Sequence, residues 1–124
     1  MKKKILIVED DQFLHKILAM KIKAAGFDVI SAYDGESALK KIKERPDLIL
    51  LDLILPQMSG FEFLGEIKIN EEYKKIPVIV LSNLGQEEDI ERAKSLGAVD
   101  YLVKANFSID EVIKKIKEWL ARKK

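Results

Sequence analysis

The chain has 124 residues, of which 48% are hydrophobic and 35% charged, and its net charge is +1. That length suits one domain with a sizeable core, and the balanced charge gives no attraction to nucleic acid or to an anionic membrane. Cysteine is absent from the sequence, which excludes disulfides, thiol catalysis and cysteine-ligated zinc.

The amino-terminal segment MKKKILIV leads directly into three acids, Glu9, Asp10 and Asp11. It lacks the long apolar region and the cleavage site of a signal peptide. No apolar run elsewhere approaches the roughly 20 residues that a helix needs to cross a bilayer. We therefore predict a cytoplasmic protein in which residues 1–124 form a single domain.

Five short runs rich in Val, Ile and Leu predict β-strands. Three of them are continuous rather than alternating, which is typical of strands that are buried on both faces of a parallel sheet. In chain order the predicted strands span residues 5–8, 29–32, 48–51, 78–81 and 99–103.

The segments between these runs are amphipathic and predict helices. In the first segment the apolar residues at helical spacing are Phe13, Leu14, Ile17 and Leu18, and the last segment carries one apolar stripe over residues 109–120. Residues that commonly cap helices mark their ends. The predicted starts are Asp34, Ser59 and Ser108, and the predicted stops are Gly26 and Gly97.

A β-strand followed by a helix, repeated five times, predicts an α/β doubly wound fold with helices on both faces of a parallel sheet. Right-handed crossovers leave few topologies for such a chain. Ligands of open α/β sheets bind beyond the carboxyl ends of the strands, near the point where the strand order reverses. These strand ends are therefore the place to look for a functional site.

Polar residues gather at the predicted strand ends. The first strand is followed by Glu9 and Asp10, the third by Asp52, the fourth by Ser82 and the fifth by Lys104. Asp52 alone is compatible with a helix cap at a strand exit. It stands inside the apolar run 48–55, however, where an unpaired carboxylate is costly, and the other strand ends supply partners for it.

Clustered carboxylates at an open rim favour a hard cation such as Mg²⁺. A metal and a lysine together neutralise the oxygens of a transferring phosphoryl group. A carboxylate in line with that group can act as the nucleophile and form an aspartyl phosphate. The predicted site therefore has the parts needed for phosphoryl transfer.

In these residues the chain resembles the receiver domain of two-component response regulators, in particular a stand-alone receiver like those of chemotaxis. The resemblance covers the whole chain and rests on four motifs. They are VED at 8–10, LLDLILPQMSG at 50–60, LSN at 81–83 and DYLVK at 100–104. It implies the flavodoxin-like (βα)5 fold, a five-stranded parallel sheet in the order 2-1-3-4-5 with five flanking helices.

The resemblance also implies a role for each site residue. Asp52 would be the phosphoacceptor, and Ser82 and Lys104 would bind the phosphoryl group, while Tyr101 would be the switching aromatic that follows Ser82. Mg²⁺, for which Mn²⁺ would substitute, would be ligated by Asp10, Asp52 and the backbone carbonyl of Ile54, with Glu9 holding it through water. Asp11 has no role in this scheme and is predicted to be a helix-start acid.

The implied reaction is transfer of a phosphoryl group from a sensor histidine kinase or phosphotransfer protein to Asp52, followed by slow self-hydrolysis, without turnover of an external substrate. Phosphorylation would remodel the surface of the fourth helix, fifth strand and fifth helix, which engages a downstream protein. We expect no direct contact with nucleic acid or membrane, a monomer or phosphorylation-linked dimer, and no effector domain after the last helix.

Three positions of the site are unusual or informative. Ala105 follows Lys104 where the family usually has a proline with a cis peptide bond, so this bond is either trans with a shifted loop or strained cis. Ile54 and Leu84 each lie two residues after a site residue, and we expect both to flank the phosphoryl group. Their apolar side chains cannot orient an attacking water, which predicts a long-lived phosphoryl group.

Two other functions stay open on the sequence alone. One is a degenerate receiver that binds partners without phosphorylation. The other is a Mg²⁺-dependent phosphatase with an aspartate nucleophile, although such enzymes need a second acid two residues later, where this chain has Ile54. The single histidine, His15, is predicted to be a surface or half-buried structural residue rather than a phosphate relay.

Overall fold

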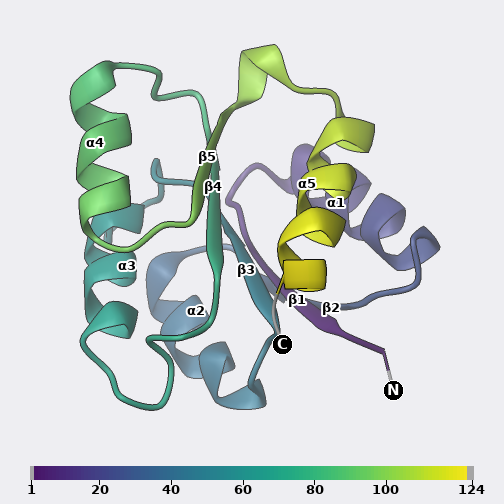
Figure 1. Ribbon diagram of the computed structural model, residues 1–124, viewed down its shortest axis with the longest axis horizontal. Coiled ribbons are helices and arrows are strands. Elements are labelled where there is room, and N and C mark those ends of the chain that lie inside the picture. The colour runs from purple at the N-terminus through teal and green to yellow at the C-terminus, as the bar shows by residue number, and fades with distance from the viewer. Residues whose placement is uncertain (1, 123–124) are drawn as a thin grey trace.

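The computed structural model describes residues 2–122, in which strands and helices alternate along the chain (Figure 1). The termini Met1, Lys123 and Lys124 of the predicted domain lie outside the described residues. All the strands pair in parallel and form one sheet in the predicted order, β2-β1-β3-β4-β5. The strands are β1 (Lys4–Val8), β2 (Asp28–Ala32), β3 (Leu48–Leu51), β4 (Val78–Ser82) and β5 (Asp100–Val103).

The helices cover both faces of this sheet, and Figure 1 shows α1 and α5 on one face and α2, α3 and α4 on the other. Two short 3₁₀ helices follow α2 and β5. Among the described residues, no helix is long and apolar enough to cross a membrane. The helices are α1 (Gln12–Ala24), α2 (Gly35–Lys41), η1 (Ile42–Glu44), α3 (Gly60–Lys68), α4 (Glu87–Ser95), η2 (Lys104–Asn106) and α5 (Ile109–Arg122).

The predicted capping residues set the helix ends. Ser59 accepts a hydrogen bond from the backbone N–H of Glu62, whose side chain accepts one from Ser59 N–H, and the same capping box recurs at the start of α5. Asp34 caps α2 through Ser37 N–H. Gly26 and Gly97 have φ of +99° and +111°, the left-handed conformation that ends a helix without steric cost in glycine.

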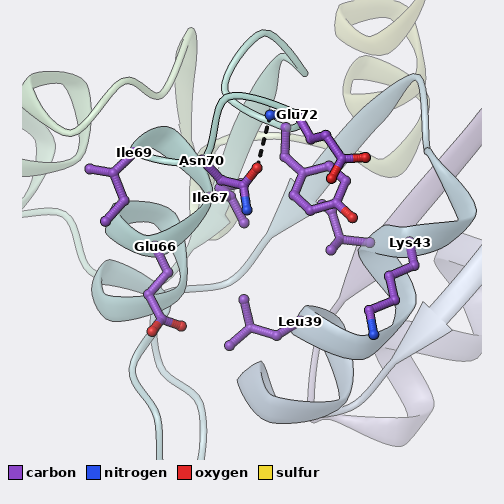
Figure 2. Close-up of a pocket in the computed structure, with 9 residues that line it drawn as sticks. Leu39, Lys43, Glu66, Ile67, Ile69, Asn70 and Glu72 are labelled. Atoms are coloured by element: carbon purple, nitrogen blue, oxygen red, sulfur yellow. Dashed lines mark hydrogen bonds between the residues drawn. The ribbon is translucent and has the colours of Figure 1, made fainter.

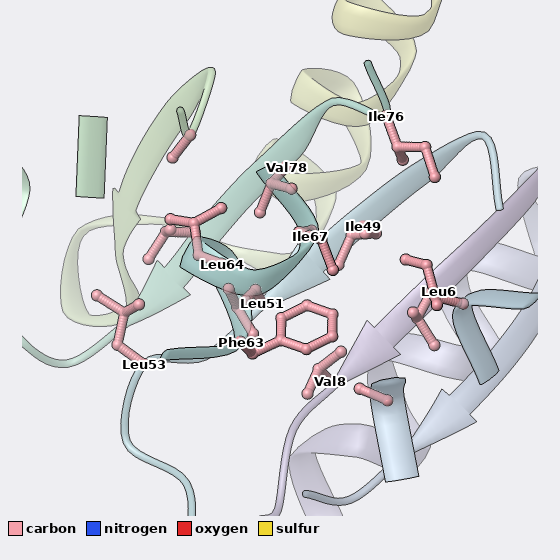
Figure 3. Close-up of a cluster of buried hydrophobic side chains, with 14 of the residues drawn as sticks. Leu6, Val8, Ile49, Leu51, Leu53, Phe63, Leu64, Ile67, Ile76 and Val78 are labelled. Atoms are coloured by element: carbon pink, nitrogen blue, oxygen red, sulfur yellow. The ribbon is translucent and has the colours of Figure 1, made fainter. Parts of the chain in front are cut away.

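The strands are buried on both faces because each face packs under helices, and this explains their continuous apolar sequence. The face under α2, α3 and α4 is filled by side chains such as Phe63, which is fully buried. Figure 3 shows the Phe63 ring beside Val8 of β1 and Leu51 of β3. The second layer of core lies under α1 and α5 and contains Leu18, Ile22 and Ile116.

The structure corrects the predicted apolar face of α1. Phe13 is 76% exposed, whereas the buried stripe of the helix runs through Leu18 and Ile22. Residues four apart lie on one side of a helix, and Leu14, Leu18 and Ile22 share this spacing, so the helix turns that stripe to the sheet. Phe13 lies about 100° away from the stripe and faces outward.

The structure also resolves the geometry after β5. No cis peptide bond occurs among the described residues, so the Lys104–Ala105 bond is trans. Lys104 is the first residue of η2, a short turn of 3₁₀ helix that ends at Asn106.

Candidate functional site

The parallel sheet brings the predicted site residues to one edge. Val8, the last residue of β1, lies opposite Leu51, the last residue of β3. The chain therefore leaves both strands side by side, and Asp52 N–H donates to the carbonyl of Val8 at 2.9 Å. On the other side of β3, strand β4 ends at Ser82, which lies opposite Val103 and so beside the start of η2.

Lys104 joins two buried carboxylates at this edge. Its Nζ lies 2.8 Å from Glu9 Oε1 and 2.8 Å from Asp52 Oδ2, and both acids are almost fully buried. One ammonium between two carboxylates leaves a net charge of about −1 when all three groups are ionised. The arrangement therefore pairs both acids with one cation and keeps an excess negative charge that a metal would neutralise.

The pKa values of these groups reflect their burial first and the neighbouring charges second. Burial raises the pKa of Glu9 to about 7, and the Asp52 charge adds to the rise, while the hydrogen bond from Lys104 opposes it. Burial lowers the pKa of Lys104, but the hydrogen bonds to Asp52 and Glu9 outweigh burial and leave that pKa raised. Lys104 is therefore charged at neutral pH, and Glu9 holds its proton more strongly than an ordinary glutamate.

Asp10 completes the acidic group. Carboxylate oxygens of Glu9, Asp10 and Asp52 all lie within 4.8 Å of one another. Asp10 is exposed, whereas the other two acids are buried, so the cluster opens to solvent on the side of Asp10. Three oxygen donors of this kind, with one open side, fit a hard divalent cation that retains waters.

The backbone around the site orients the acids. Ile54 N–H donates to Asp52 Oδ1 at 3.1 Å, and Asp11 N–H donates to Glu9 Oε2 at 3.1 Å. The Asp11 side chain stays outside the cluster and caps α1 by accepting from Leu14 N–H, as predicted for a helix-start acid. The role of the Asp11 backbone was not predicted, because sequence pattern does not show where an N–H points.

Gly60 allows the chain after Asp52 to fold closely back over the site. A Cβ at this position would lie 2.5 Å from the carbonyl oxygen of Asp52 and 2.6 Å from the Cα of Leu53. A hydrogen bond holds the two segments together here, because Gly60 N–H donates to the carbonyl of Leu53 at 3.0 Å. The start of α3 thus fixes the backbone of Asp52, and only glycine leaves room for it.

Ser82, Leu84 and Tyr101 form a hydrogen-bonded group beside the acids. Ser82 is fully buried and its Oγ accepts from Leu84 N–H at 3.4 Å, while Tyr101 O–H donates to the Leu84 carbonyl at 2.5 Å. Burial, reinforced by the Asp89 and Asp52 charges, raises the pKa of Tyr101 to about 12. The loop after β4 is therefore tied to the hydroxyl of Tyr101.

The two residues predicted to flank the phosphoryl group differ in exposure. Ile54 is 51% exposed, whereas Leu84 is half-buried.

The prediction for His15 was wrong in its burial. The ring is 1% exposed, its Nδ1 lies 2.9 Å from the carbonyl of Glu9, and it stacks on Tyr33 with 4.2 Å between ring centroids. Burial lowers the pKa of His15, so the ring is neutral at pH 7. The burial of His15 follows from the rotation of α1 about its axis, which places this residue next to the buried stripe of Leu18 and Ile22.

A separate pocket of about 600 Å³ lies between α2 and α3, away from the acidic cluster (Figure 2). Its wall combines the apolar side chains of Leu39 and Ile69 with Glu66 and Lys43. Asn70 Oδ1 there accepts from Glu72 N–H at 2.8 Å, which is a local turn contact. The pocket lacks the convergent buried charges of the strand edge, so that edge is the stronger candidate for chemistry.

Comparison with known proteins agrees with this choice. The model of the response regulator receiver domain family matches residues 5–117. The chain is 39% identical over 123 residues to the alkaline phosphatase synthesis transcriptional regulatory protein PhoP of Bacillus subtilis, and 37% identical over 123 residues to the phosphate regulon transcriptional regulatory protein PhoB of Escherichia coli. Each alignment covers 98% of this chain, and 50% and 53% of those relatives. The chain thus spans about half the length of the curated relatives it matches.

Solved structures share the same fold. The chemotaxis protein CheY4 of Vibrio cholerae superposes with a TM-score of 0.88 at 30% identity, covering 95% of this chain and 98% of that chain. The phosphorylated cyanobacterial phytochrome response regulator RcpA gives 0.85 at 33% identity, covering 98% and 95%. The Mn²⁺-bound response regulator Rcp1 gives 0.82 at 33% identity, covering 95% and 94%.

Proposed function

We propose that this chain, which belongs to the response regulator receiver domain family, is a signalling switch that accepts a phosphoryl group on Asp52. The observation that carries the proposal is the bridge from Lys104 to Asp52 and Glu9, with 2.8 Å to each carboxylate. It supports a phosphoryl site because the same edge offers a buried nucleophilic carboxylate, a cation for the transferred oxygens and acids for a metal.

The proposed reaction uses the side chains in distinct roles. An oxygen of Asp52 forms a bond to phosphorus as the P–N bond to a donor phosphohistidine breaks, which regenerates the donor imidazole. Lys104 then pairs with an oxygen of the transferred group, and the hydroxyl of Ser82 donates to another. Ile54, which lies two residues after Asp52 and is half exposed, has no polar side-chain group that could orient an attacking water.

The metal proposed for this site is Mg²⁺, with Mn²⁺ as a substitute. Glu9, Asp10 and Asp52 would hold it, directly or through water, together with the backbone carbonyl of Ile54. When bound, the ion supplies positive charge that neutralises the phosphoryl oxygens. The Mn²⁺-bound form of Rcp1 supports divalent metal binding within the same fold.

We propose a histidine kinase or phosphotransfer protein as donor and a protein target that reads the surface of α4, β5 and α5. Tyr101 supports this choice of surface, because it lies on β5 and its hydroxyl holds the loop that leads from Ser82 to α4. The relatives PhoP and PhoB are named transcriptional regulatory proteins, and this chain spans about half of each. A target that acts in transcription is therefore one class of output to test.

Two alternatives are weaker on the same geometry. A receiver that never takes a phosphoryl group would not need Lys104 held between Asp52 and Glu9, and the trans bond to Ala105 leaves that lysine in place. A phosphatase would need a general acid two residues after Asp52, where Ile54 offers none. We therefore propose that the chain is not a true enzyme and catalyses only its own phosphorylation and dephosphorylation.

The proposal is tested by the intact mass of the protein after incubation with acetyl phosphate and Mg²⁺. We expect a gain of one phosphoryl group that disappears in Asp52→Asn and after addition of EDTA. Asp47→Asn, a change of another aspartate of the chain, is the matched control and should still gain the group. No gain in the folded wild-type protein with Mg²⁺ present would refute the proposal and favour the degenerate receiver.

A further inference from the structure

We propose that a cavity between α1 and the end of β2 is a second ligand site, which takes a small organic anion that also carries a hydroxyl group. The cavity measures about 620 Å³. Its polar wall is formed by Gln12, His15, Lys16, Lys23, Ser31 and Tyr33. None of these residues belongs to the acidic cluster, and the proposal does not depend on the phosphorylation of Asp52.

The buried ring of His15 is the first observation. Its Nδ1 carries a proton, because the partner at 2.9 Å is the carbonyl oxygen of Glu9, which can only accept. In the neutral ring Nε2 is then an acceptor, and it is buried without a hydrogen-bond partner among the described residues. A buried acceptor of this kind is normally paired, so the site calls for a donor such as a hydroxyl.

The charge of the cavity wall is the second observation. Lys16 and Lys23 lie seven residues apart on α1, which places them on one side of the helix, and both are exposed at the rim. Lys41 also lies close by, since its Nζ donates to the carbonyl of Ser31 at 2.7 Å. The lining contains no carboxylate, so the cavity attracts anions.

Tyr33 covers one face of the histidine ring. Its ring stacks on His15 with an interplanar angle of 24° and is itself 46% exposed. A half-exposed ring has room to rotate away, whereas the histidine beneath it is fixed by the Glu9 carbonyl. A ligand in this cavity that reaches the edge of the imidazole would place its hydroxyl on His15 Nε2 and its charged group near Lys16 and Lys23. A phosphate monoester of a small polyol has both groups.

The test uses glycerol 3-phosphate as the probe and the imidazole NMR signals of His15 as the readout, which need no assignment because the chain has one histidine. EDTA is present throughout, so that metal-assisted binding at the acidic cluster is excluded. We expect a saturable shift with glycerol 3-phosphate, a weaker one with sulfate and none with glycerol. An absent or non-saturable shift with glycerol 3-phosphate would overturn the site and leave water as the partner of Nε2. An equal response to sulfate would overturn the hydroxyl contact.

Matched variants separate this site from general charge effects. Lys16→Gln with Lys23→Gln removes the cationic rim and should weaken binding by about tenfold, as expected for losing two exposed charge contacts. Lys114→Gln with Lys117→Gln removes two exposed lysines from α5 and should change the affinity less than twofold. Equal weakening by both pairs would mean that the anion responds to net charge alone and would overturn the proposal.

Discussion

The Nζ of Lys104 lies 2.8 Å from Oδ2 of Asp52, across 52 residues of chain, and the same atom lies 2.8 Å from Glu9. The contact joins the ends of three strands, because Glu9 follows β1, Asp52 follows β3 and Lys104 follows β5. The contact therefore depends on the parallel arrangement of these strands, which brings the three charged groups of the site together. Four predictions about this site can be measured, of which the first two follow from the bridge itself.

The first concerns Lys104 itself. Lys104→Met leaves two buried carboxylates without their cation, and we expect it to lower the free energy of unfolding by about 3 kcal/mol in EDTA. Saturating Mg²⁺ should restore more stability in this variant than it adds to the wild-type protein, since a divalent ion replaces the lost charge. Chemical denaturation with and without Mg²⁺ measures both effects.

Lys115→Met is the control for that variant. Lys115 makes a looser ion pair, 3.8 Å from Glu118, on the partly exposed side of α5, and its loss should cost less than about 1 kcal/mol with no added response to Mg²⁺. If the two lysine variants behaved alike, Lys104 would not be the counter-charge of the acidic cluster.

The second prediction concerns the pH dependence of stability. Burial raises the pKa of Glu9 from its ordinary value of 4.5 to about 7, so between these values the folded protein keeps a proton that the unfolded chain has released. The free energy of unfolding in EDTA should therefore fall as the pH rises from about 4.5 to 7, by on the order of 2 kcal/mol. Denaturation curves across this range measure the slope.

Glu9→Gln removes this titration and should flatten the slope. Glu88→Gln removes an exposed acid of α4 and should leave the wild-type dependence unchanged. A slope that survives Glu9→Gln would assign the pH dependence to another group.

The third prediction concerns the turn over Asp52. Gly60→Ala would place a Cβ 2.5 Å from the Asp52 carbonyl, and backbone cannot move away cheaply, so we expect a loss of about 1–3 kcal/mol of stability. Gly65→Ala, in the same helix, meets its nearest atom at 4.0 Å and should raise stability by about 0.5–1 kcal/mol through helix propensity. Thermal or chemical unfolding of both variants measures these two changes in stability. Equal effects would argue against a close approach at Gly60.

Much of this fold was predictable because its signals are local. Apolar runs marked the ends of the five strands to within a residue, and short capping motifs marked the starts of α2, α3 and α5. Parallel topology then brought Glu9, Asp10, Asp52 and Lys104 to one edge, as predicted. The exposure of Phe13 and the burial of His15 were missed, because they depend on how α1 rotates against the sheet. A periodicity that allows two neighbouring stripes does not determine that rotation.

The fourth prediction concerns the lifetime of the phosphoryl group. Ile54 is half exposed beside Asp52, and neither it nor Leu84 can orient water. Ile54→Asn combined with Leu84→Glu should speed loss of the phosphoryl group by roughly tenfold or more, because polar side chains can position the attacking water. The decay of the phosphorylated mass after removal of acetyl phosphate measures the rate.

Ile69→Asn is the matched control. Ile69 is also apolar, is 84% exposed and lies in the pocket between α2 and α3, away from the acids. It should leave the rate unchanged. An unchanged rate in the double variant as well would show that these two positions do not limit hydrolysis.

The most direct measurement is to locate the phosphoryl group on the chain. Borohydride reduces an acyl phosphate to an alcohol, so a phosphorylated aspartate becomes homoserine, which peptide mass spectrometry identifies by position. After treatment with acetyl phosphate and Mg²⁺, we predict homoserine at position 52 and unmodified Asp10 and Glu9. Homoserine at position 10, or a phosphoryl group that resists reduction and lies elsewhere, would contradict the assignment of Asp52 as the phosphoacceptor.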